Sequence, residues 1–186
     1  IDNLPFWAEL SSTPSSKVSL ISEWEKKVQA IIKESINQNV TSFAGVPSWM
    51  LSLLQQVMDK TGKDNISEIW KNSEVYFHGG VNFDPYRNIY KKLFPSKDFK
   101  YFEIYNASEG FFAIQDQNNS DELLLMLDYG IFYEFIPTNS SEQEIISLAD
   151  VKLNVNYSLV ITTNSGLWRY KICLLYTSDA ADELCR

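Results

Sequence analysis

The spacing of hydrophobic and polar residues along the chain predicts three helices. Residues 22–37 carry apolar side chains every three or four positions, which is the period of an amphipathic helix. Ser22 and Glu25 have the spacing of a capping box at its start. Residues 47–62 and 84–94 show the same period, and each segment has a proline near its beginning. The first eighteen residues show no clear period, so we expect a connecting segment there.

Short apolar runs between these helices predict strands. Residues 40–44, 74–78 and 101–105 alternate with helices, and this order predicts parallel strands joined by right-handed crossovers. Beyond Gly110 the helical period stops and turn-rich spacers follow. The later runs predict antiparallel strands at residues 111–115, 123–127, 131–136, 157–163 and 167–170. The expected fold is therefore an α/β fold with a parallel β-α-β-α-β core followed by antiparallel strands.

The last residues of the chain do not continue this pattern. From Cys173 to Arg186, small and acidic residues replace the aromatic alternation, and both cysteines of the chain lie here. Residues 175–183 resemble the translation product of a sequencing adapter. We therefore expect one partial domain at residues 1–172 and a non-native tail at residues 173–186.

Composition and charge restrict the function classes. The 186 residues are 45% hydrophobic and 14% aromatic, which is sufficient for one globular core. A formal net charge of −8 argues against a nucleic-acid partner, which needs clustered basic residues. No apolar run approaches the roughly eighteen residues of a membrane span, and no signal peptide is evident, so we expect a cytoplasmic protein without a membrane partner. The initial Ile1 suggests a piece of a longer protein.

One histidine and two cysteines leave little material for zinc or nucleophilic chemistry, so catalysis would use carboxylates, hydroxyls and backbone amides. Three loops follow the predicted parallel strands, at residues 45–49, 78–81 and 105–110, where ligands of open α/β sheets gather. The third loop combines an aromatic residue, small residues, the Ser108 hydroxyl and the Glu109 carboxylate. This set suits a nucleotide and its magnesium ion.

Each of these features also has a purely structural interpretation. Spacing alone favours a polar turn in which Glu109 is solvated. Gly79 and Gly80 fit a tight turn as well as a backbone that a ligand approaches. His78 fits a partly buried structural histidine, and Trp49 fits the core.

Several blocks in the same order resemble the acyl-acid amido synthetases of the auxin-responsive promoter family, in particular their bacterial members, within the luciferase-like adenylate-forming superfamily. The resemblance covers residues 5–172. The matching blocks include residues 20–27, Gly45-Val46-Pro47-Ser48-Trp49, Phe77-His78-Gly79-Gly80-Val81, Tyr105-Asn106-Ala107-Ser108-Glu109-Gly110 with residues 111–113, and Gly166-Leu167-Trp168-Arg169-Tyr170.

The resemblance implies ATP and Mg²⁺ as cofactors and assigns roles to individual residues. Tyr105 would pack against adenine, Ser108 would approach the phosphate, and Glu109 would bind the magnesium ion; Ser108 and Glu109 are the expected catalytic residues. The implied nucleotide-binding residues are Gly79, Gly80, Tyr105, Asn106, Ala107, Ser108, Glu109 and Gly110. The implied residues of the acyl-acid pocket are Val46, Pro47, Trp49, Phe77 and His78.

In the resembled family, a carboxylate attacks the α-phosphate of ATP to give an acyl-adenylate, and the amine of an amino acid then forms an amide. The expected partners are thus a small carboxylic acid and an amino acid. The family pattern departs where Cys173-Leu174 replace a Gly-Asp pair and Lys171 replaces an arginine. A phosphate loop and a C-terminal domain are also missing, so we predict no ligase activity for this chain alone. The alternatives are an acyl-coenzyme A ligase and a non-catalytic binding module.

Overall fold

The computed structural model describes residues 5–118, 120, 122–138, 144–153 and 155–172. The predicted tail at residues 173–186 lies outside this range. The chain forms two compact units, the first at residues 1–77 and 83–100 and the second at residues 78–82 and 101–186. The elements in chain order are α1 (Phe6–Ser11), α2 (Ser16–Ser19), α3 (Trp24–Ser35), β1 (Ser42–Gly45), α4 (Pro47–Thr61), η1 (Ile66–Glu68), β2 (Val75–His78), α5 (Asp84–Leu93), β3 (Lys100–Ala107), β4 (Gly110–Ile114), β5 (Leu124–Leu125), β6 (Ile131–Pro137), β7 (Ile146–Ser147), η2 (Leu148–Asp150), β8 (Tyr157–Thr163) and β9 (Tyr170–Lys171).

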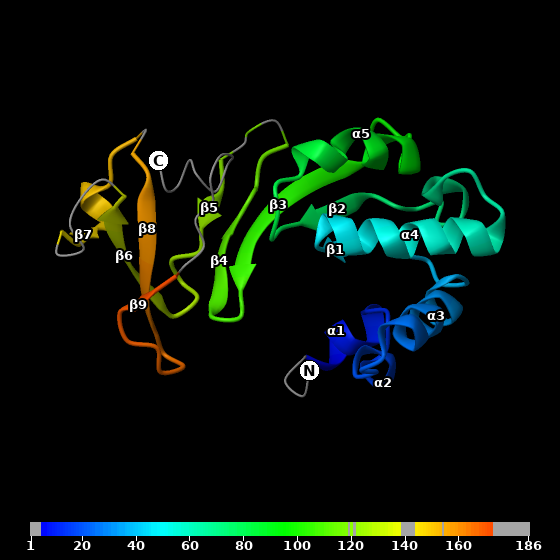
Figure 1. The fold of residues 1–186 in the computed structure, drawn as a ribbon, viewed down its shortest axis with the longest axis horizontal. Coiled ribbons are helices and arrows are strands. Elements are labelled where there is room, and N and C mark those ends of the chain that lie inside the picture. The colour runs from blue at the N-terminus through cyan, green and yellow to red at the C-terminus, as the bar shows by residue number, and fades with distance from the viewer. Residues whose placement is uncertain (1–4, 119, 121, 139–143, 154, 173–186) are drawn as a thin grey trace. The chain divides into compact units, whose positions relative to one another are not determined.

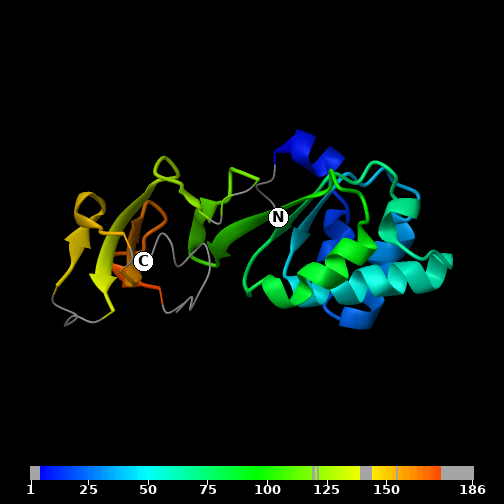
Figure 2. The same ribbon diagram turned by 90° about the horizontal axis from the view of Figure 1, so that it is seen from above.

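The predicted alternation of strands and helices is confirmed. One sheet has the strand order β1-β2-β3-β4-β5, and a second has the order β7-β6-β8-β9. In the first unit, the amide of Glu74 donates to the carbonyl of Thr41, and the amide of Lys100 donates to the carbonyl of Glu74. Helices α4 and α5 run side by side next to β1 and β2 (Figures 1 and 2). The fold is therefore the expected mixed α/β arrangement of parallel and antiparallel strands.

Helix α4 shows how local sequence signals define an element. Pro47 occupies the first turn, where its missing N–H has no helical partner to lose. Gly62 ends the helix in the left-handed conformation, with φ of 65°, and its amide donates to the Met58 carbonyl over 2.8 Å. Both ends were predicted correctly because proline and glycine act through their own backbone geometry.

Two predictions for the N-terminal region were wrong. The first eighteen residues contain helix α1 and the start of α2 rather than a connecting segment alone. Helix α3 begins at Trp24 with Glu23 as its N-cap, so Ser22 lies outside the helix and the predicted capping box does not form. Short helices with weak periodicity are decided by packing rather than by propensity, which explains both errors.

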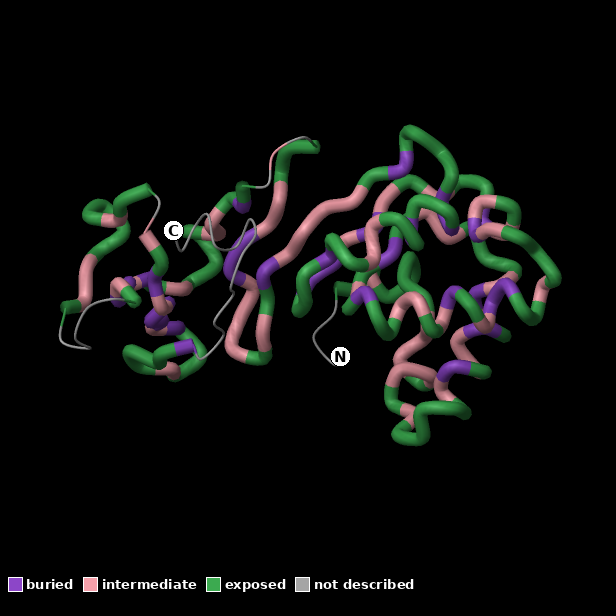
Figure 3. Tube along the Cα trace, turned by 45° about the horizontal axis from the view of Figure 1, so that its top comes forward, coloured by how far each residue is buried: buried purple, intermediate pink, exposed green. Residues whose placement is uncertain are grey.

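Each unit has its own buried core (Figure 3). In the first unit, the core joins α3, α4, β2 and α5 through Ile32, Leu54, Tyr76 and Tyr90, all nearly inaccessible to solvent. The rings of Tyr76 and Tyr90 stack with centroids 4.9 Å apart. This aromatic pair fixes α5 against β2.

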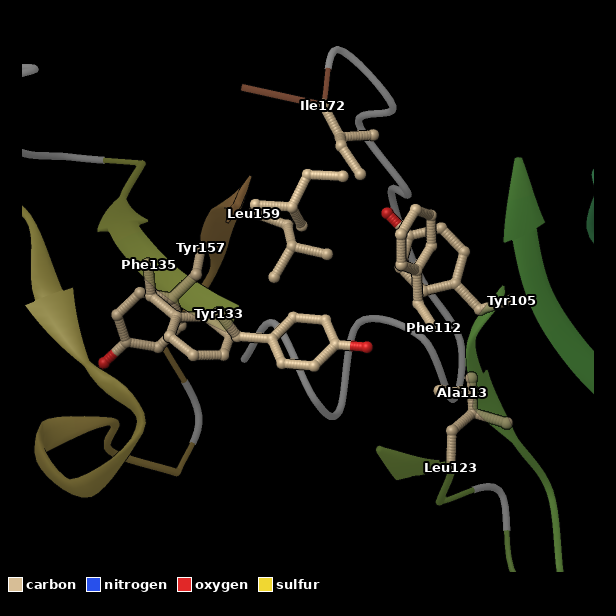
Figure 4. Packing of buried hydrophobic residues seen from close by; sticks show 10 residues of the cluster. Tyr105, Phe112, Ala113, Leu123, Tyr133, Phe135, Tyr157, Leu159 and Ile172 are labelled. Carbon is tan, nitrogen blue, oxygen red and sulfur yellow. The ribbon is translucent and has the colours of Figure 1, made fainter. Parts of the chain in front are cut away.

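The second unit is built from antiparallel strands, as predicted. β3 pairs with β4, β4 with β5, and β8 pairs with β6 on one side and β9 on the other. The hairpin of β8 and β9 turns at Gly166, whose amide donates to the Thr163 carbonyl, although β9 is shorter than expected. Figure 4 shows the core of this unit, whose side chains come from both sheets. Its members are Tyr105, Phe112, Ala113, Leu123, Tyr133, Phe135, Tyr157, Leu159, Ile161 and Ile172.

Candidate functional site

The first unit contains a cavity of about 880 Å³. Val46, Trp49 and Phe77, three of the residues expected in the acyl-acid pocket, line this cavity. Trp49 is 63% exposed and not part of the core, and its ring contacts Trp24 edge-on, with centroids 5.0 Å apart. The structural interpretation of Trp49 as a core residue is therefore wrong. Pro47, the fourth expected residue of this unit, is buried.

The segment from Gly45 to Pro47, which joins β1 to α4, is held by two tyrosine hydroxyls. Tyr76 donates to the Gly45 carbonyl over 2.8 Å, and Tyr90 donates to the Pro47 carbonyl over 2.7 Å. Burial raises the pKa of Tyr76 to about 12 and also raises the pKa of Tyr90, so both hydroxyls keep their protons at neutral pH. The segment that lines the cavity is therefore fixed by side chains from β2 and α5.

The predicted nucleotide-binding loop at residues 105–110 is a tight β-hairpin in the second unit. Asn106 and Ala107 belong to β3, Gly110 begins β4, and only Ser108 and Glu109 form the turn. Tyr105 pairs with Ala113 but Asn106 pairs with Phe111, so the register shifts at this point. The expectation of a loop over the whole segment was wrong, since antiparallel pairing extends almost to its tip.

The hairpin turn presents two oxygen-bearing side chains. Ser108 is exposed and Glu109 is partly exposed. In the part of the chain that the structure describes, neither side chain takes part in a hydrogen bond or an ion pair with protein groups. A carboxylate and a hydroxyl with open coordination suit a hard cation that keeps phosphate oxygens and waters as its other ligands. The donor set therefore fits the predicted magnesium ion, which Glu109 would hold.

Tyr105 lies just before the turn and is largely covered by protein. Its side chain is 5% exposed, and its ring is tilted against Phe112 with centroids 5.1 Å apart. The bulge in the hairpin places Phe112 and Ala113 both in the core (Figure 4). Packing of Tyr105 against adenine stays a prediction, and it requires one edge or face of the ring to remain open.

Gly79 and Gly80, the two glycines expected to admit the nucleotide, lie in the second unit. The backbone requires glycine at each position, for a different reason. A Cβ atom on Gly79 would lie 2.3 Å from the carbonyl oxygen of Ile104, so the chain itself approaches too closely for any side chain. Gly80 has a φ of 82°, in the left-handed region that favours glycine. His78, which precedes them, is buried. The close approach of Ile104 accounts for Gly79 and the positive φ accounts for Gly80, and nucleotide contact with these glycines stays a prediction.

Sequence reasoning missed the residues that hold other residues in place. Tyr76 was expected only in a strand and Tyr90 only on a helix. Their hydrogen bonds join residues 31 and 43 positions apart, and no local pattern in the sequence predicts such partners. Arg169 was noted only as part of a matching block. Its guanidinium binds both carboxylate oxygens of Glu134, each over 2.9 Å, while its backbone has a φ of 46°.

Among the residues that the structure describes, no group of three or more histidine, cysteine, aspartate or glutamate side chains forms a metal cluster. Within the same ranges, no helix combines the length and the apolar character needed to cross a bilayer.

The alternating α/β unit and the antiparallel unit define a fold shared with acyl acid amido synthetases. The structure superposes on a GH3.15 acyl acid amido synthetase with a TM-score of 0.64 and 13% identity, covering 87% of this chain and 38% of that chain. Residues 2–99 match the GH3 family N-terminal domain, and residues 124–173 match the GH3 family central domain. The chain therefore belongs to the GH3 family, which confirms the family resemblance found in the sequence.

Sequence relatives agree with this assignment. The chain is 34% identical over 79 residues to a probable indole-3-acetic acid-amido synthetase GH3.1 of Oryza sativa subsp. japonica, covering 37% of this chain and 13% of the relative. It is 26% identical over 183 residues to the indole-3-acetic acid-amido synthetase GH3.3 of Arabidopsis thaliana, covering 89% of this chain and 28% of the relative. The chain thus spans less than a third of the length of these relatives.

Proposed function

We propose that the chain is part of an ATP-dependent ligase that adenylates a carboxylic acid and transfers the acyl group to the amine of an amino acid. The observation that carries this proposal is the open Ser108 and Glu109 pair at the tip of the β3–β4 hairpin, in a member of the GH3 family. Similarity to indole-3-acetic acid-amido synthetases supports the reaction class. The cavity beside Val46 and Trp49 supports a site for the acid.

In the proposed reaction, a carboxylate oxygen of the acid attacks the α-phosphorus of ATP, and pyrophosphate leaves. The amine then attacks the acyl carbon, the amide bond forms, AMP leaves and the amine proton passes to solvent. A bound magnesium ion would offset negative charge on the phosphates. Glu109 would hold that ion, and the Ser108 hydroxyl would donate to a phosphate oxygen. No covalent bond to the protein is required, which suits a chain with one histidine.

The test is the ATP–pyrophosphate exchange of the full-length protein in the presence of its acid. Glu109→Gln preserves size but removes the charge, so we expect exchange to fall by roughly a hundredfold or more. The matched control is Glu122→Gln, an exposed glutamate of the same unit, which should leave exchange unchanged. Exchange that survives Glu109→Gln at the wild-type rate would refute the role of Glu109.

The acyl-coenzyme A ligase remains the second candidate because it shares the adenylation step and differs only in the acceptor. Product analysis with amino acids and with coenzyme A, offered separately to the full-length protein, distinguishes amide from thioester. A non-catalytic module would give neither product. We further propose that the 186-residue chain has no ligase activity by itself, and acyl-adenylate formed by the purified chain would contradict this.

A further inference from the structure

An apolar contact joins the tip of the β3–β4 hairpin to the start of β6. A Cβ atom on Gly110 would lie 2.9 Å from the Cδ1 atom of Ile131 and 3.0 Å from the Cε1 atom of Phe112. The end of the Ile131 side chain therefore fills the space that a side chain at position 110 would take. Because Gly110 directly follows Glu109, this contact acts on the backbone next to the proposed magnesium ligand.

Ile131 is itself fixed by the second sheet. It is the first residue of β6 and pairs with Thr163 of β8. The bend before it is tied to the same strand pair, because the amide of Asn164 donates to the Gly130 carbonyl over 3.2 Å. A Cβ atom on Gly130 would lie only 2.7 Å from the Nδ2 atom of Asn164, so the two segments are in close contact. The Ile131 side chain thus extends from a backbone that is held on both sides of its Cα atom.

A second contact joins the hairpin to the same bend. The rings of Phe111 and Tyr129 have centroids 6.1 Å apart and planes inclined at 38°. Tyr129 is 54% exposed, so solvent can reach this contact easily. Ile131, in contrast, packs against the buried core of the second unit. We therefore expect Ile131 to provide the stronger restraint on the hairpin tip.

The turn itself provides little to orient its carboxylate. Within the ranges that the structure describes, the Glu109 side chain has no hydrogen bond or ion pair with protein groups. Side chains that bind metals usually have their orientation fixed by neighbouring groups. We infer that Ile131 is a positioning residue, whose side chain packs on Gly110 and fixes the backbone from which the Glu109 carboxylate reaches a metal ion. This inference rests on the proposed function, because Glu109 is the metal ligand proposed there.

The first test examines the turn without any ligand. Ile131→Val removes the Cδ1 methyl group and keeps the rest of the side chain. In the 186-residue chain, the ¹⁵N order parameters of Ser108 and Glu109 should fall from about 0.85, typical of rigid backbone, to about 0.6 or below. The matched control is Ile146→Val on β7, which changes another half-buried isoleucine packed against the same core and should leave both values unchanged. Urea unfolding checks that the two variants lose similar stability.

The second test measures the affinity of the full-length protein for ATP by calorimetry, in excess Mg²⁺ and again in EDTA. A less restrained carboxylate should weaken only the metal-dependent binding. We expect Ile131→Val to raise the dissociation constant by about fivefold in Mg²⁺ and to leave it unchanged in EDTA. Ile146→Val should change neither value. In a Glu109→Gln background, Ile131→Val should have no further effect, because the carboxylate that it positions is absent.

Three results would overturn the inference: unchanged order parameters in Ile131→Val, equal effects of Ile131→Val and Ile146→Val on ATP affinity in Mg²⁺, or an effect of Ile131→Val that persists beside Glu109→Gln. A failure of the proposed function gives a different result. If Glu109→Gln alone leaves the affinity in Mg²⁺ at its wild-type value, the proposed metal role of Glu109 is refuted. If Glu109→Gln weakens that affinity and the two isoleucine variants behave alike, the positioning role of Ile131 is refuted by itself.

Discussion

Two segments that carry predicted site residues are the connection between β1 and α4 and the hairpin between β3 and β4. They differ in the contacts that hold them in place. In the first connection, buried tyrosine hydroxyls from Tyr76 and Tyr90 bind the backbone carbonyls, so tertiary contacts hold the segment. In the hairpin, the strands themselves hold the turn, and the side chains of Ser108 and Glu109 stay open. A cavity wall needs a fixed shape, whereas the proposed magnesium site would need uncommitted oxygen atoms.

The largest expected effect tests how closely the chain packs beneath Gly79. Gly79→Ala should destabilise the second unit by about 3 kcal/mol or more, because the new Cβ would overlap the Ile104 carbonyl oxygen. Urea unfolding followed by circular dichroism measures the change. The control is Gly62→Ala, whose new Cβ would meet open space. Its left-handed backbone alone should lower the free energy of unfolding, by about 1 kcal/mol. Equal effects of the two variants would show that Gly79 is not closely packed.

The next prediction removes one hydroxyl from the first connection. Tyr90→Phe should lower the free energy of unfolding by about 1–2 kcal/mol, because the Pro47 carbonyl loses its buried donor. The indole resonance of Trp49 should shift as α4 loses this anchor. Tyr129→Phe, which removes a hydroxyl from an exposed side chain, should change neither quantity. An unchanged Trp49 resonance in Tyr90→Phe would mean that the connection is fixed without this hydrogen bond.

The same connection should be sensitive to alkaline pH. Burial raises the pKa of Tyr76 to about 12, whereas an unfolded tyrosine ionises near 10. The raised value means that the folded state prefers the proton, so the stabilisation is complete below about pH 10 and is lost as pH rises to about 12. Stability should fall there by up to roughly 1.4 kcal/mol per pH unit for this residue. Unfolding of wild type and Tyr76→Phe between pH 9 and pH 12 measures the difference, and parallel curves would contradict it.

The smallest expected effect concerns the ion pair of Arg169 and Glu134. Arg169→Lys should cost only about 0.5 kcal/mol, because the Arg169 side chain of the pair is 58% exposed, although lysine cannot bind both carboxylate oxygens. Arg169→Gly should be close to neutral, since relief of the positive φ offsets the lost pair. Thermal unfolding of the two variants measures this balance. A loss above about 2 kcal/mol in Arg169→Lys would show that the pair contributes more than its exposure suggests.

The sequence predicted correctly the features that depend on neighbouring residues, and it failed for features that depend on residues far apart in the chain. The ends of α4 were predicted correctly because Pro47 and Gly62 act through their own backbone conformations. The hairpin at residues 105–110 was mistaken for an open loop because its pairing with β4 depends on a register shift that no local pattern encodes. Contacts such as Tyr90 with Pro47 join residues far apart in the chain, so periodicity could place the tyrosine on a helix but not identify its partner.

The sequence named the residues of the proposed site but could not predict their environment. Ser108 and Glu109 emerged as oxygen donors from their chemistry and from the family resemblance, and they lie at a turn. Tyr105 was chosen for its flat ring, but whether a ring is open or covered depends on packing with Phe112, which is a tertiary property. The same reason explains why Trp49 is exposed even though its position on an amphipathic helix favoured the core.

The edge-on contact of Trp24 with Trp49 has an optical consequence. Two indoles with centroids 5.0 Å apart and planes inclined at 75° are close enough to couple their electronic transitions, so we expect a pair of far-ultraviolet circular dichroism bands of opposite sign. Because one indole lies on α3 and the other on α4, this signal depends on their mutual geometry and not on helix content. The circular dichroism of this indole pair would therefore report how closely α3 packs against α4.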